Sequence, residues 1–179
     1  MERRELIQWL VATAGLHALD SLAPADLLAL GRDVHGSRDP ALRVLSPPAE
    51  RTVAAAAERI LPGATAAGAS AFIDKMLADW HTPAERERFF AGLPDLDSRC
   101  RMRRGRDFVA CAVPDQVAVL TALDDQVTAL RAEDGAAANQ HWFAMLKYLT
   151  VYGWCTSEPG MRALGLYPMA GRYDGCAPL

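Results

Sequence analysis

Apolar residues are densest in the segment between residues 139 and 156. After His141, only Lys147 and Thr150 interrupt a run of aromatic and aliphatic residues that ends at Trp154. A helix that is apolar on nearly all sides must be covered on most of them, so this pattern predicts a helix in the middle of a bundle or between two subunits. The run is too short, and too clearly interrupted by Lys147, to predict a membrane span.

Polar residues and glycines that favour helix ends and turns follow this apolar run. Thr156 or Ser157 is expected to cap a short second helix, with Gly165 as the residue that follows its end. Residues 166–179 show no helical period, so we expect an extended C-terminal tail. The residues that would pin this tail to a surface are Tyr167, Tyr173 and Cys176.

Further helices have clear start signals. Ser46, followed by two prolines, is expected to cap one helix, and Phe72 lies in a second apolar stripe between residues 70 and 80. Thr82 and Glu85 have the spacing of a capping box, and the short helix they open should end at Gly92. A later stripe predicts one long amphipathic helix buried through Val117, Leu120, Leu123, Val127 and Leu130.

These elements predict an all-α fold: a single-domain multi-helix bundle of about eight helices, with an extended C-terminal tail. The chain of 179 residues is long enough for a substantial core, and no strand-turn-strand pattern stands out. We expect residues 1–23 to form an N-terminal helix and residues 24–179 to form the helical domain.

The N-terminus allows two interpretations. Arg3 and Arg4 precede a moderately apolar run and resemble a twin-arginine export signal, although Glu2 stands where such signals usually have serine. Alternatively, Leu6 and Leu10 belong to one helical stripe, so the segment is an ordinary amphipathic helix with a charged start. A working signal predicts a periplasmic protein, and a non-functional one predicts a cytoplasmic protein.

Charge gives little reason to expect nucleic acid as a partner. The net charge is −3, and no aromatic residues alternate with the five arginines of the basic run between Arg99 and Arg106. This Arg99–Arg106 run is either a solvated helix face or a docking patch for an acidic partner. The second possibility would make the chain a free-standing helical adaptor.

No catalytic, metal or cofactor site is evident. The histidines form no pair at metal-ligand spacing, and the glycines lack the G-x-G-x-x-G spacing of a dinucleotide-binding loop. Cys155 could be a reactive thiol at a helix N-terminus, but a buried structural thiol is the more ordinary role. A disulfide between Cys155 and Cys176 competes with free thiols, and the sequence cannot decide between them.

Several segments carry a recognisable pattern. Residues 60–64 read ILPGA and residues 69–74 read ASAFID; residues 89–97 read FFAGLPDLD; residues 152–160 and 171–176 read YGWCTSEPG and GRYDGC. These segments resemble the signatures ILPG-A … FID, F-x-x-GL-x-x-LD and GYYTSE-G … G-x-Y-x-G-C of the gluconate 2-dehydrogenase subunit 3 family. The resemblance runs from about Ser46 to the C-terminus. It departs from the family at Trp154 and Cys155, where two tyrosines are common.

The resemblance implies a small subunit, without a cofactor of its own, in a membrane-associated or periplasmic dehydrogenase complex. It implies a large FAD-containing partner of the glucose-methanol-choline type that oxidises a sugar, a sugar acid or a glycoside, the last at its C3 hydroxyl. A cytochrome c with haem c, or an iron–sulfur cluster elsewhere in the complex, would accept the electrons. The small subunit would support assembly of the flavoprotein and carry the export signal.

Aromatic residues are crowded near the C-terminus, and Tyr and Trp are favoured both in cores and at interfaces. We therefore expect the partner interface to lie on the central apolar helix and the segment that follows it. The expected interface residues are Trp142, Tyr148, Tyr152, Trp154, Cys155, Thr156, Ser157, Glu158, Tyr167, Tyr173 and Cys176.

Overall fold

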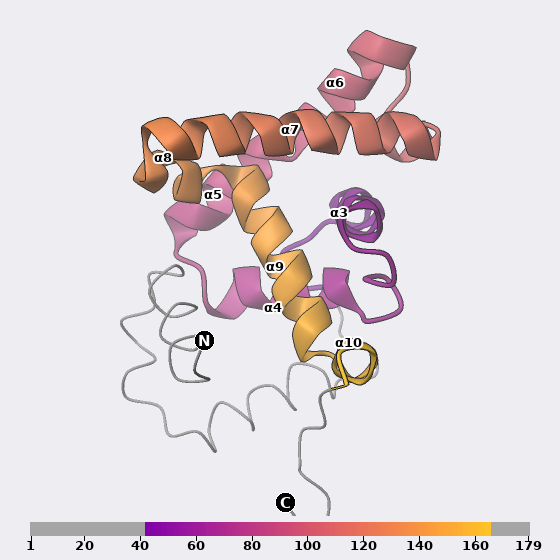
Figure 1. The fold of residues 1–179 in the computed structure, drawn as a ribbon, viewed down its shortest axis with the longest axis vertical. Helices are drawn as coiled ribbons and strands as arrows, with labels where there is room; N and C mark the ends of the chain where they lie inside the picture. Colours follow the sequence, from indigo (N-terminus) through magenta and orange to yellow (C-terminus); the bar gives the residue numbers. More distant parts are fainter. Residues whose placement is uncertain (1–41, 166–179) are drawn as a thin grey trace, which may run out of the picture.

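The computed structural model describes residues 42–165, and this part of the chain is a helical bundle without strands (Figure 1). The predicted all-α, single-domain fold is therefore confirmed, while the expected N-terminal helix and C-terminal tail lie outside the described residues. The elements are α3 (Pro47–Ile60), α4 (Ala69–Asp79), α5 (Pro83–Gly92), α6 (Pro94–Arg104), the 3₁₀ helix η2 (Phe108–Ala110), α7 (Val113–Glu133), α8 (Gly135–Gln140), α9 (Trp142–Thr156) and α10 (Glu158–Ala163).

Helix α9 runs through the middle of the bundle, as its apolar sequence predicts. It contacts α3, α4, α5, α7, α8 and α10, with α7 crossing near its start and α10 lying at its end (Figure 1). The turns of α9 bury residues on several sides because neighbours cover most of its circumference. The buried residues are Trp142, Phe143, Met145, Leu146, Leu149, Thr150 and Gly153.

The predicted helix starts are confirmed by their hydrogen bonds. The Ser46 hydroxyl accepts a hydrogen bond from the Ala49 N–H at 3.4 Å, which caps α3. At α5, the Thr82 hydroxyl accepts from the Glu85 N–H at 3.3 Å, and the Glu85 carboxylate accepts from the Thr82 N–H at 2.8 Å. These contacts satisfy backbone donors that the helices themselves leave without partners.

Helix α5 ends at Gly92, as predicted, but not through a left-handed glycine. Leu93, itself in helical conformation, joins α5 to α6, and the φ of Gly92 is not positive. Gly92 serves tertiary packing instead. A Cβ atom at this position would lie 2.0 Å from Cγ of Trp142, so only glycine lets α5 approach the start of α9.

The buried face of α7 also differs from the predicted one. Val117 is 42% exposed, whereas Gln116 and Val119 are buried. The Gln116 side chain can be buried because its amide donates a hydrogen bond to the Phe108 carbonyl at 2.9 Å. A pattern of apolar residues cannot reveal this contact, so the expected stripe was wrong at its first position.

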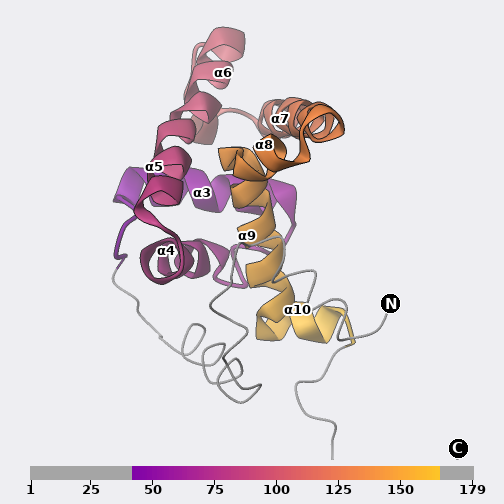
Figure 2. The same ribbon diagram turned by 90° about the vertical axis from the view of Figure 1, so that its left-hand side faces the viewer.

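Helix α6 protrudes from one end of the bundle, at the opposite end from α10 (Figures 1 and 2). Its neighbours are α5, η2 and α7. Leu96 and Cys100 are its buried side chains, and its other face carries the arginine run toward solvent. The helix is therefore held along one side only.

Where α4 and α9 cross, the backbone of the central helix closely approaches an aromatic ring of its neighbour. Gly153 of α9 is buried beneath Phe72 of α4. A Cβ atom at Gly153 would lie 2.7 Å from Cδ1 and 3.0 Å from Cγ of that ring. The absence of a side chain at this position therefore sets the distance between the two helices.

We predict that Gly153→Ala destabilises the chain by about 1–3 kcal/mol, because the added methyl group must displace the Phe72 ring. Thermal unfolding followed by circular dichroism measures the effect. Gly135→Ala is the matched control, since a Cβ atom there has no neighbouring atom within 4 Å. Equal melting temperatures for the two variants would contradict the proposed packing constraint.

Candidate functional site

The α4–α9 crossing brings together segments that are far apart in sequence. The rings of Phe72 and Tyr152 meet edge to face, with centroids 5.5 Å apart. Beside them, Trp154 packs against a small cluster of buried alanines. The alanines are Ala57, Ala64 and Ala69. The ILPGA and ASAFID segments thus form a surface on which the YGW segment of α9 rests.

A carboxylate holds the loop between α3 and α4 in place under Trp154. The two oxygens of Glu58 accept hydrogen bonds from the N–H groups of Gly63 and Thr65, each at 2.9 Å. These bonds favour the charged carboxylate and lower the pKa of Glu58 below its ordinary value. Gly63 has a φ of 91°, a conformation that glycine adopts readily and L-residues rarely do.

The turn between α9 and α10 depends on Ser157. Its hydroxyl accepts from the Gly160 N–H at 3.1 Å and donates to the Trp154 carbonyl at 2.7 Å. A Cβ atom at Gly160 would lie 1.9 Å from that same carbonyl oxygen, so the turn excludes any side chain there. Of the two expected caps, Ser157 is therefore the one used, and Gly165, with a φ of 67°, follows α10 as predicted.

Thr156, the other candidate cap, bonds back into its own helix. Its hydroxyl donates to the Tyr152 carbonyl at 2.8 Å. The threonine therefore satisfies a carbonyl in the last turn of α9 rather than an N–H group of α10. The segment from Tyr152 to Gly160 is built mainly to hold the α9–α10 turn.

Four residues of α9 share one partly exposed face, which we call the α9 tyrosine face: Tyr148, Val151, Tyr152 and Cys155. Their spacing of three and four positions places them on the same side of a helix. The rings of Tyr148 and Tyr152 stack with centroids 5.8 Å apart and planes 9° apart, and Val151 is 40% exposed. This face offers aromatic and aliphatic surface that the rest of the bundle leaves partly uncovered.

The ionisable groups of the α9 tyrosine face are held in their neutral forms. Burial raises the pKa of Tyr148 to about 12, with a smaller contribution from Tyr152, whose own pKa burial also raises. Cys155 carries a free thiol, and burial raises its pKa as well. A protonated thiol is a poor nucleophile, so this environment disfavours the catalytic role considered for Cys155.

The sequence profile of gluconate 2-dehydrogenase subunit 3 matches residues 47–175. The chain belongs to this family. The match starts at the first residue of α3 and spans every helix of the described bundle, so the resemblance seen in the motifs is confirmed. No curated protein and no solved structure matches the chain.

The family's small subunits belong to a dehydrogenase complex, and the structure places some of the residues expected to contact a partner. Trp142 and Ser157 are buried within the chain, Trp154 and Thr156 are partly buried, and Glu158 is exposed. Glu158 forms an ion pair with Arg162 of α10. The other expected residues, Tyr167, Tyr173, Cys176 and the arginines Arg3 and Arg4, lie outside the described residues.

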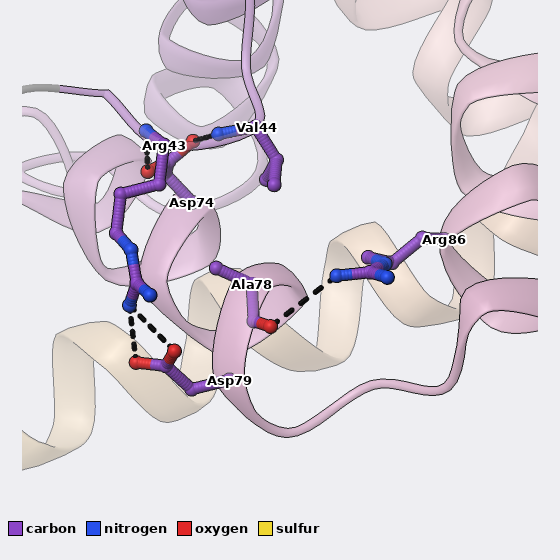
Figure 3. Close-up of polar contacts among 6 residues, drawn as sticks. All are labelled: Arg43, Val44, Asp74, Ala78, Asp79 and Arg86. Atoms are coloured by element: carbon purple, nitrogen blue, oxygen red, sulfur yellow. Dashed lines mark hydrogen bonds and ion pairs between the residues drawn. The ribbon is translucent and has the colours of Figure 1, made fainter.

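Asp74, the last letter of the FID signature, anchors the chain where it enters the bundle (Figure 3). It is 3% exposed, and its carboxylate accepts hydrogen bonds from three successive N–H groups. The donors are Arg43 at 2.7 Å, Val44 at 3.0 Å and Leu45 at 2.7 Å. Sequence reasoning assigned no role to Asp74, although an acidic residue within an apolar helical stripe was a signal for one.

The Arg43 side chain adds a second contact between the segment before α3 and helix α4. Its guanidinium binds both oxygens of Asp79, at 2.5 and 2.6 Å (Figure 3). On the same helix, the Ala78 carbonyl accepts from Arg86 of α5 at 3.3 Å. Helix α4 therefore links the entry of the chain to α5 as well as to α9.

Most of the arginine run is neutralised within the family domain. Arg99, Arg101 and Arg104 form ion pairs, and their partners are Asp95, Asp107 and Asp115. Between residues 42 and 165, Arg103 and Arg106 form no ion pair. The structure therefore leaves a smaller basic patch than the sequence suggests.

No three His, Cys, Asp or Glu side chains come together as a metal site within the part of the chain that the structure describes. Among the helices it contains, none has the length and apolar composition needed to cross a membrane. In the signature segments, the side chains of Asp74 and Ser157 bind backbone groups of the chain itself. Their evident role is to hold α3, α4, α9 and α10 together.

We predict that Asp74→Ala lowers the free energy of unfolding by about 3 kcal/mol, because it removes a charged acceptor from three backbone donors. Denaturant unfolding measures this loss, provided that the dependence of the free energy of unfolding on denaturant concentration is the same in both proteins. Asp79→Ala is the control, since its partly solvated pair with Arg43 is worth less than about 1 kcal/mol. A similar loss in both variants would refute the anchoring role of Asp74.

Proposed function

We propose that this chain is a non-catalytic small subunit that stabilises a large FAD-containing dehydrogenase subunit of the glucose-methanol-choline type. The substrate of the complex would be a sugar, a sugar acid or a glycoside, the last oxidised at C3. The observation that carries the proposal is the family match, which spans the whole described bundle. The FAD and the substrate site belong to the large subunit in this proposal.

The α9 tyrosine face supports a role in protein binding. Aromatic residues bury a large area at little cost in side-chain entropy, and Tyr is enriched among the residues that dominate binding energy. The stacked rings of Tyr148 and Tyr152 are already held in one arrangement, so little freedom would be lost on binding. Their neutral phenols can also donate hydrogen bonds to a partner.

The small subunit would stabilise the folded large subunit by binding to it and would not take part in the oxidation of the substrate. A protein that binds only the folded large subunit stabilises it in proportion to its concentration and affinity. Electrons from the flavin would pass to a cytochrome c or an iron–sulfur cluster elsewhere in the complex. Arg3 and Arg4 would route the assembled pair to the periplasm through the twin-arginine pathway.

The decisive experiment is co-expression of the full chain with the flavoprotein subunit from the same organism, followed by affinity purification on this chain. We expect a yellow complex of fixed stoichiometry whose flavin absorbance is bleached by the correct sugar. The flavoprotein alone should be recovered in lower yield. Recovery of this chain as a colourless, stable monomer under the same conditions would reject the proposal.

Two valines with similar exposure allow a matched test of the binding surface. Val151→Asp places a charge on the α9 tyrosine face, whereas Val117→Asp places one on the exposed side of α7. We predict at least about tenfold weaker binding of the flavoprotein by the first variant, because a buried unpaired charge is costly at an interface. Titration calorimetry measures the affinities, and equal affinities would exclude this face.

Replacing both Arg3 and Arg4 by lysine tests export separately from binding. Lysine preserves the charge that an ordinary amphipathic helix would need, but removes the arginine pair that defines the signal. We predict that the complex then accumulates in the cytoplasm, while its stoichiometry and flavin content are unchanged. Cell fractionation provides the measurement, and undiminished periplasmic activity would show that these arginines are not the signal.

A further inference from the structure

Two buried cysteines meet where the protruding helix α6 contacts η2. Cys100 lies on the inner face of α6 and is 1% exposed, and Cys111 directly follows η2 and is 8% exposed. After burial, the neighbouring Cys111 thiol contributes most to raising the pKa of Cys100, so the two side chains lie next to each other. The Cys111 thiol donates a hydrogen bond to the Arg106 carbonyl at 3.8 Å. Both belong to the same hydrophobic core, which shields the two sulfur atoms from solvent.

Contacts that do not involve sulfur hold this pair in position. The Asp97 carboxylate of α6 accepts from the Phe108 N–H of η2 at 2.8 Å, and the Phe108 carbonyl accepts from Gln116 of α7 at 2.9 Å. An ion pair between Arg101 and Asp107 at 2.6 Å joins the same two elements. The fold therefore brings Cys100 and Cys111 together whether or not they are bonded.

We propose that Cys100 and Cys111 form a disulfide when the chain folds in an oxidising compartment. Each thiol loses its hydrogen as one sulfur–sulfur bond forms. The two electrons and two protons pass to a disulfide of the exchange type, such as oxidised glutathione or a dithiol oxidase, which becomes two thiols. This inference is independent of the partner and of the proposed dehydrogenase function.

The environment of the pair determines when the bond can form. Burial raises the pKa of Cys100 to about 12, and the neighbouring Cys111 thiol adds to the shift. Because exchange requires a thiolate, the folded, reduced chain reacts slowly, and the bond forms while the segment is still exposed during folding. Once the core has closed, the same burial protects the disulfide from reductants.

The bond would strengthen the attachment of a helix that the bundle contacts along one side only. Helix α6 protrudes from the bundle and contacts only α5, η2 and α7 among the elements with several contacts (Figure 2). A covalent link between its inner face and the end of η2 closes a short loop and restricts the unfolded chain. The polar contacts between α6 and η2 would then also be held close by the covalent link.

The sequence allows a direct test by peptide mapping. Trypsin cleaves after Arg101, Arg103, Arg104 and Arg106, all of which lie between the two cysteines. The full chain is unfolded with reductant, refolded with oxidised glutathione, alkylated and digested without reduction. We expect mass spectrometry to find the Cys100 peptide joined to the peptide of residues 107–131, and addition of reductant to separate them.

Cysteine variants show which two residues form the disulfide and how much it stabilises the chain. Cys155→Ser should retain the linked peptide, whereas Cys111→Ser should lose it. The oxidised wild-type chain should melt about 10 °C above the reduced chain, and Cys111→Ser should remove that difference. The proposal would be overturned if the refolded chain shows full helical circular dichroism but its Cys100 and Cys111 are found on separate peptides or joined to other cysteines.

Discussion

The close approach of α4 and α9 at Gly153 is the contact on which the rest of the bundle depends. The Phe72 ring occupies the space that a side chain at Gly153 would need, so the two helices can cross without a gap. The same device recurs at both ends of α9: Trp142 packs onto Gly92 of α5, and Gly160 of α10 lies against the Trp154 carbonyl. Three glycines thus position the central helix against three neighbours.

This packing explains why the family signature contains so few groups suited to catalysis. Asp74 and Ser157 of the signature are polar, as is Glu58 just before its first segment, but each of them binds backbone N–H groups of the chain itself. They satisfy donors that would otherwise be left without partners at the entry to the bundle, in the α3–α4 loop and at the start of α10. The signature therefore describes a scaffold, and such a scaffold suits a subunit that supports another protein.

The scaffold leaves the α9 tyrosine face partly uncovered. The other sides of α9 are used by the core, which is why Trp142, although aromatic, has little surface to offer a partner. Burial raises the pKa of the Tyr148 and Tyr152 phenols and of the Cys155 thiol further above neutral pH, so these groups are uncharged there. Such a surface is suited to uncharged, largely apolar contact, and the internal pairing of Arg99, Arg101 and Arg104 reduces the rival basic patch.

The sequence alone determined the helical class, the helix starts at Ser46 and Thr82, and the central position of α9, because caps and apolar periodicity act over a few neighbouring residues. It also determined the family, through short motifs. Only the tertiary structure decided the roles of Gly92, Gln116 and Asp74, because each depends on a group from a distant segment: the Trp142 ring, the Phe108 carbonyl and the backbone of residues 43–45. A local sequence pattern does not show which group from a distant segment will contact a given residue in the folded chain.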